Sequence, residues 1–153
     1  MKKFLLIFFF SILTITNGNS ADLKIKQFDG KIFDLENQKG KVVLVVFWAS
    51  WCGNCKKQLP ILDAVYQKNK NRNFEVIGIS TDFPKQKQKA FNFAKQLSFR
   101  NASALDIISA SFSKPSPVPT YYLINQKGEF VKEIFESEEL NAKDLQKILD
   151  NIL

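Results

Sequence analysis

The two cysteines of the chain, Cys52 and Cys55, are separated by only two residues. They stand where an apolar run gives way to a segment with helical spacing of apolar residues. At the start of a helix, this spacing brings the two Cα atoms within the roughly 4.4–6.8 Å that a disulfide spans. The pair could therefore form and break a disulfide reversibly, which predicts thiol redox chemistry.

The surroundings of Cys52 predict that it is the attacking sulfur, because only a thiolate attacks a disulfide. At a helix N-terminus, unpaired N–H groups and the helix dipole favour negative charge. Lys56 and Lys57 add positive charge, and Trp51 can shield the sulfur without fully burying it. We expect Cys52 to form a mixed disulfide with a substrate and Cys55 to resolve it, leaving the pair oxidised.

Other uses of two thiols stay open. The pair could form a purely structural disulfide, although a disulfide across two intervening residues at a helix start is poorly placed to stabilise a fold. Two thiolates can hold copper(I), so a copper(I) chaperone is an alternative; the absence of His, and of any Met beyond Met1, weighs against it. A thiol peroxidase is another, but such enzymes set one attacking Cys beside an Arg, and the nearest in sequence is Arg72. Zinc needs four ligands, so we predict no zinc site and no cofactor.

A second candidate feature is the Val118–Pro119 bond, which lies in a proline-rich loop just before an apolar segment. An X–Pro bond in such a loop is either an ordinary trans loop bond or a cis bond. In the cis form, the Val118 backbone would turn outward beside the sulfurs and pair with an extended substrate segment. The sequence alone leaves these two interpretations about even.

Alternating strands and helices are expected to position these residues. Residues 23–35 predict a β-hairpin turning at Asp29-Gly30, and the continuous apolar runs 42–48 and 74–80 predict strands buried on both faces. A helix is expected from about Cys52 to Lys70. The cysteines then lie where a strand ends and a helix begins, which is the usual ligand edge of an open α/β sheet.

The second half of the chain predicts further elements of both kinds. Asp82 is expected to cap a helix whose buried face includes Ala90 and Ala94. A short helix is expected around Ser103–Phe112, followed by two strands over 121–124 and 130–135 and a last helix capped by Asn141. The order predicts one α/β domain with a central mixed β-sheet, helices on both faces and an N-terminal β-hairpin.

The first twenty residues predict a signal peptide or membrane anchor rather than part of the fold. Lys2 and Lys3 precede an apolar run over 4–15 that is too short for a comfortable membrane span. The domain over 21–153 is thus expected in the periplasm or another extracytoplasmic location, on the membrane only if the segment is retained. The net charge of +7 comes from scattered lysines, which does not favour nucleic-acid binding.

The block Phe47–Cys55 with Pro60, the lead-in 40–44 and the distal stretch 118–128 together resemble the TlpA/ResA-like branch of thioredoxin-fold proteins. The resemblance implies a thioredoxin-like fold, Cys52 as nucleophile, Cys55 as resolver and Pro119 as a cis-proline. From their places in the sequence, we expect Trp51, Val118 and Pro119 to contact the substrate. The resemblance further implies reduction of protein disulfides outside the cytoplasm, often in apocytochrome c during cytochrome c biogenesis, with electrons from a membrane thiol reductase.

Two residues depart from the pattern of this family. Asn54 precedes the second cysteine where the family often has proline, so the reduction potential is not implied. Gln58 stands where the family often has an acid, and a glutamine cannot accept the proton of Cys55. Val46 is likewise apolar where cytoplasmic thioredoxins have an acid, so water, or Asp82 if it lies near, is expected to serve instead.

Overall fold

The computed structural model describes residues 20–112, 115, 117–134 and 141–153. Apart from Ser20, which bridges to Glu129, the predicted targeting segment lies outside the described residues. Within them, no helix is both long enough and apolar enough to cross a membrane.

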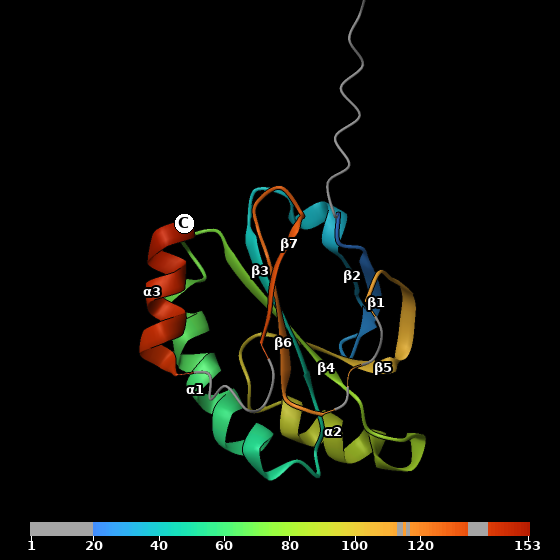
Figure 1. The fold of residues 1–153 in the computed structure, drawn as a ribbon. Coiled ribbons are helices and arrows are strands. Elements are labelled where there is room, and N and C mark those ends of the chain that lie inside the picture. Colours follow the sequence, from blue (N-terminus) through green and yellow to red (C-terminus); the bar gives the residue numbers. More distant parts are fainter. Residues whose placement is uncertain (1–19, 113–114, 116, 135–140) are drawn as a thin grey trace, which may run out of the picture.

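A seven-stranded mixed sheet forms the centre of the molecule, with the strand order β2-β1-β5-β4-β3-β6-β7 (Figure 1). The three central strands β5, β4 and β3 run parallel to one another, and the outer pairs are antiparallel. The strands are β1 (Leu23–Gln27), β2 (Ile32–Asp34), β3 (Val42–Trp48), β4 (Phe74–Ser80), β5 (Arg100–Ala110), β6 (Thr120–Ile124) and β7 (Phe130–Ile134).

The helices flank this sheet on both faces, as predicted. They are α1 (Gly53–Asn69), α2 (Lys87–Ala94) and α3 (Ala142–Ile152), with short 3-10 turns η1 (Leu35–Gln38) and η2 (Pro84–Gln86). Helices α1 and α3 lie together on one side, and α2 lies apart from them (Figure 1). The sequence prediction for α3 is confirmed at its start, where the Asn141 side chain accepts a hydrogen bond from the Lys143 N–H.

Both predicted central strands are confirmed with the same bounds, and every residue of β3 and β4 is buried. Apolar residues that do not alternate with polar ones are expected in a strand whose two faces are both covered. Strands β3 and β4 lie in the middle of the sheet, where both faces are covered. The N-terminal hairpin is also confirmed, and Gly30 at its turn has φ of 86°, which glycine adopts without a steric penalty. The two strands end together at the edge where α1 begins.

The helix predicted around Ser103–Phe112 is wrong, because most of this segment, up to Ala110, belongs to the long strand β5. Its first part pairs with β4 in parallel, and its second part pairs with β1 in antiparallel fashion. Neither partner is adjacent in sequence, so local spacing could not reveal the pairing. Tertiary hydrogen bonding has decided the conformation of a segment whose own preference is weak.

Candidate active site

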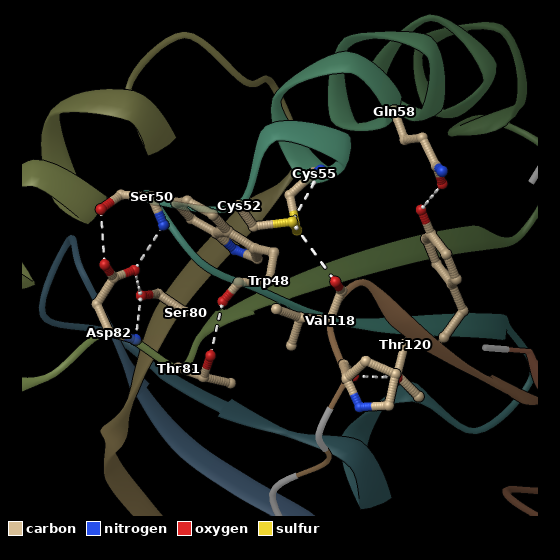
Figure 2. The surroundings of a disulfide bond; sticks show 12 residues. Trp48, Ser50, Cys52, Cys55, Gln58, Ser80, Thr81, Asp82, Val118 and Thr120 are labelled. Carbon is tan, nitrogen blue, oxygen red and sulfur yellow. Dashed lines mark hydrogen bonds between the residues drawn. A yellow bond between two sulfur atoms is a disulfide. The ribbon is translucent and has the colours of Figure 1, made fainter. Parts of the chain in front are cut away.

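Cys52 is the N-cap residue of α1 and directly follows the loop that leaves β3. Its backbone is extended, and its Sγ accepts a hydrogen bond from the Cys55 N–H at 3.0 Å (Figure 2). The sulfur thus takes the place of the oxygen that Ser, Thr or Asp supplies at most helix starts. In the reduced protein, the same N–H and the helix dipole favour the thiolate over the thiol.

Cys52 and Cys55 are joined by a disulfide in this structure, with their Cα atoms 5.3 Å apart. The predicted proximity of the two thiols is therefore confirmed. Cys52 is 6% exposed, and Cys55 is completely buried. Only Cys52 offers an attacking reagent any surface, so its sulfur is the outer one of the pair and the sulfur of Cys55 is the inner one.

A distant loop reaches the same sulfur. The Val118–Pro119 peptide bond is cis, as one of the two sequence interpretations proposed. The carbonyl oxygen of Val118 lies 3.5 Å from the Sγ of Cys52 (Figure 2). Strand β6, which begins at Thr120, pairs with β3, and this pairing holds the loop over the start of α1. Trp51, by contrast, is 58% exposed and presents much of its ring to solvent.

Gln58 lies one helical turn beyond Cys55, and its side chain meets β6. The Tyr121 hydroxyl donates a hydrogen bond to Gln58 Oε1 at 2.6 Å (Figure 2). Burial raises the pKa of Tyr121 above its ordinary value, so the hydroxyl keeps its proton at neutral pH. This pair is uncharged, and neither member can take up the proton of Cys55.

Asp82 does not cap a helix, so that sequence prediction is wrong. The residue is 1% exposed, and its carboxylate accepts three hydrogen bonds. Ser50 donates through its N–H at 2.8 Å and through its hydroxyl at 2.6 Å, and the Ser80 hydroxyl donates at 2.6 Å (Figure 2). The hydrogen bonds tie the end of β4 to the loop that carries Cys52.

Thr81 adds a further link between the same two loops. Its N–H donates to the Trp48 carbonyl oxygen at 2.7 Å, and its hydroxyl donates to that oxygen at 3.2 Å. The role of the run Ser80-Thr81-Asp82 was missed from sequence. Its signal was three polar residues placed directly after a buried strand, at the edge where α/β sheets bind ligands.

The geometry supports thiol–disulfide exchange better than metal binding. One sulfur has a narrow opening to solvent, the second lies behind it, and a backbone carbonyl lies alongside. Among the residues that the structure describes, no cluster of three or more His, Cys, Asp and Glu side chains could hold a metal ion. Arg72 follows the far end of α1 and pairs with Asp150 at 2.7 Å, so it is not the arginine that a peroxidase site would need.

Comparison with known proteins points the same way. Residues 18–133 match the model of the AhpC/TSA family. A thiol-disulfide oxidoreductase ResA of Bacillus cereus is 33% identical over 129 residues, covering 81% of this chain and 73% of that relative. ResA of Bacillus subtilis (strain 168) is 30% identical over 124 residues, covering 79% and 68%.

A solved structure shares the fold. It is the thiol:disulfide interchange protein, a thioredoxin family protein, from Chlorobium tepidum TLS. It superposes with a TM-score of 0.74 at 20% sequence identity, covering 88% of this chain and 95% of that one. At this identity the likeness concerns the fold, which is thioredoxin-like as predicted.

Proposed function

The chain belongs to the AhpC/TSA family and is a thiol–disulfide oxidoreductase, and from this premise we propose that it reduces protein disulfides outside the cytoplasm. The observation that carries the proposal is the arrangement of three groups. The Cys52 sulfur caps α1, the buried Cys55 sulfur lies behind it, and the Val118 carbonyl lies 3.5 Å in front. An attacking thiolate, a resolving thiol and a site for substrate backbone are thereby combined.

The reaction proceeds in two exchanges of sulfur for sulfur. The Cys52 thiolate attacks one sulfur of a substrate disulfide, and the other substrate sulfur leaves as a thiolate. Cys55 then loses its proton and attacks Cys52 Sγ in the mixed disulfide, which releases the second substrate thiol. Two electrons pass to the substrate, and the Cys52–Cys55 disulfide remains. Since Gln58 and Tyr121 are neutral, water is the acceptor we propose for the Cys55 proton.

An extended substrate segment binds beside Cys52 in this proposal. The Val118 carbonyl accepts a backbone N–H of the substrate, as in recognition by strand addition. Pro119 holds that carbonyl toward the sulfur, and Trp51 covers the outer side of the segment. The narrow exposure of Cys52 means that a substrate must place its own sulfur close to this loop.

The cycle needs a source of electrons and a compartment in which disulfides persist. We propose that residues 1–20 direct the domain over 21–153 to the periplasm or another extracytoplasmic location, where disulfides are common. There a membrane thiol reductase returns electrons to the oxidised pair. Apocytochrome c, reduced before haem attachment, is the substrate that the resemblance to TlpA/ResA-like proteins implies.

Single cysteine variants of the full chain test the mechanism. We expect Cys55→Ser to accumulate a mixed disulfide with substrate, because the resolving thiol is missing, and Cys52→Ser to accumulate none. Both variants should lose insulin reduction to the background rate. Non-reducing gels and mass spectrometry identify the trapped species. Full insulin-reducing activity in both variants would contradict the proposal.

The two alternatives predict different results with the same reagents. A copper(I) chaperone would hold copper(I) tightly in the reduced form and exchange disulfides slowly. A thiol peroxidase would consume hydrogen peroxide through Cys52 alone, so Cys55→Ser would keep the first turnover. Measurement of copper retention and peroxide consumption beside insulin reduction separates the three activities.

A further inference from the structure

Asp82 is the buried charge that lies closest in the fold to the loop of the reactive cysteine. Its carboxylate binds the N–H and hydroxyl of Ser50, two residues before Cys52, and the hydroxyl of Ser80 (Figure 2). The Ser80 oxygen itself accepts the Asp82 N–H at 3.2 Å, which leaves its hydroxyl proton free to donate. Three donors are therefore aimed at its two oxygens, which is the pattern of hydrogen bonds that a carboxylate accepts.

The charge of Asp82 is not neutralised by an ion pair. The ion pairs of the described residues join other partners, and none includes Asp82. Hydrogen bonds from serines stabilise the anion but leave its net charge in place. A buried charge is screened far less by salt than an exposed one, so its field extends to the neighbouring groups.

The nearest group that changes charge in the reaction is the Cys52 sulfur, which lies on the order of 10 Å from the carboxylate, given the reach of two residues. Two like charges at that separation, with an effective dielectric constant of about 20, shift an equilibrium by roughly tenfold. Lys56 and Lys57 oppose this effect, but both are exposed to solvent and screened. Solvent and salt screen the charge of each lysine more than that of the buried carboxylate.

The effect of Asp82 on the reduction potential depends on which redox form of the cysteine pair carries a negative charge. Reduction of the disulfide produces a Cys52 thiolate, and whatever stabilises that thiolate makes the pair more oxidising. A nearby anion destabilises the thiolate and favours the disulfide. We propose that the Asp82 carboxylate lowers the reduction potential of the Cys52–Cys55 pair and so favours its action as a reductant. This inference rests on the proposed function and names a group that favours the direction of electron flow proposed there.

Asp82→Asn in the full chain is the direct test, since asparagine keeps the shape and can retain the bonds to Ser50 and Ser80. We expect the equilibrium constant for reduction by dithiothreitol, which passes two electrons to the disulfide and closes its own ring, to rise roughly tenfold. That corresponds to a potential about 30 mV less negative. Asp82→Ser, a smaller neutral residue, is the second variant and is expected to shift the potential in the same direction.

The chain offers a matched control in Asp63, which is 8% exposed. Its carboxylate accepts the N–H and the hydroxyl of Ser98, both at 2.7 Å, and the Gln67 side chain at 2.9 Å. It lies eight residues beyond Cys55, or about 12 Å further along α1. Asp63→Asn replaces a buried, hydrogen-bonded carboxylate in the same way as Asp82→Asn, but it should change the equilibrium constant less than twofold.

Ser50→Ala separates charge from positioning, because it removes one hydrogen bond and keeps the carboxylate. We expect it to change the equilibrium constant less than threefold. The proposal is overturned if Asp82→Asn leaves the potential unchanged or makes it more negative, or if Asp63→Asn shifts it equally. The measurement uses dithiothreitol alone, so its result is independent of the trapping experiment that tests the proposed function.

Discussion

At the scale of single residues, the two sulfurs differ in access to solvent as well as in their position at the helix start. Cys55 is completely buried, while Cys52 retains a narrow opening bounded by the Val118 loop. A reagent in solution therefore has access to Cys52 only. In the cycle that we propose, this difference in burial makes Cys52 react first and Cys55 second.

The burial of Tyr121 predicts that the free energy of unfolding falls at alkaline pH. Burial raises the pKa of its hydroxyl in the folded protein, whereas in the unfolded chain it ionises near pH 10. Above about pH 10 the unfolded state therefore binds fewer protons, and the free energy of unfolding falls as pH rises, by up to about 1.4 kcal/mol per pH unit from this group.

Tyr121→Phe removes that contribution. We expect the variant to lose about 1 kcal/mol at pH 8, because Gln58 loses its hydrogen-bond donor, and to decline less steeply than the parent between pH 10 and 11. Urea unfolding of the oxidised protein at pH 8, 10 and 11 measures both effects. Parallel decline of the two proteins above pH 10 would show that Tyr121 ionises freely in the folded state.

At the scale of elements, the site is assembled where β3 and β4 end and where β6 begins. The parallel pairing of β3 with β4 brings Trp48 opposite Ser80, so the loops that follow both strands meet at one edge. Antiparallel pairing with β6 brings Phe47 opposite Thr120, and the Val118 loop arrives from the other side. The active-site loop is thus held between two neighbours that the sheet fixes.

Gly78 lies in the middle of β4, where the surrounding side chains leave no room for a Cβ atom. A Cβ there would collide with Asn101 Oδ1 and lie 3.0 Å from a ring carbon of Phe99 and 3.1 Å from Trp48 Nε1. We expect Gly78→Ala to lower the free energy of unfolding by about 1–3 kcal/mol, as overpacking of a filled core does. Urea unfolding of the oxidised protein measures the loss.

Asn101→Ala in the Gly78→Ala background is the control for that mechanism. It removes the colliding side chain, so the two changes should be non-additive and the double variant should cost less than the sum of the single ones. Additive losses would place the strain elsewhere in the strand.

The elements also show how far sequence reasoning reached. Strands β3 and β4 were predicted with correct bounds because an unbroken apolar run leaves few other choices. The Cys52–Cys55 pair and the Val118–Pro119 loop were found because cysteine and proline are chemically distinctive. Strand β5 was missed because its partners are distant in sequence, and the Ser50–Asp82 bonds were missed because they join side chains 32 residues apart.

At the scale of the whole molecule, the outer strands extend the sheet on both sides of the strands that hold the site. The hairpin of β1 and β2 joins the sheet through β5, and β7 closes the other edge. The N-terminal strand of the described fold begins directly after the segment that we propose as a targeting signal. The signal can therefore be removed or retained without changing the strands that hold the site.

The location of this molecule depends, in our proposal, on its first twenty residues. The reduction of disulfides that we propose requires a compartment where substrates are oxidised, and the apolar run over 4–15 is the feature that would direct the chain there. We expect Leu6→Asp with Phe9→Asp to hold the chain in the cytoplasm, because each charged residue in such a run costs about 3 kcal/mol on membrane insertion. Fractionation with an alkaline phosphatase fusion measures the location.

Leu105→Asp is the matched control, because Leu105 is exposed on β5 and outside the apolar run. The control should leave the fusion active outside the cytoplasm, whereas the double variant should silence it. If the unaltered chain is found in the cytoplasm, the proposed export is contradicted. The cysteine pair would then lie in a compartment that already keeps thiols reduced. In that case the low potential that we assign to Asp82 would serve cytoplasmic disulfides that form only transiently.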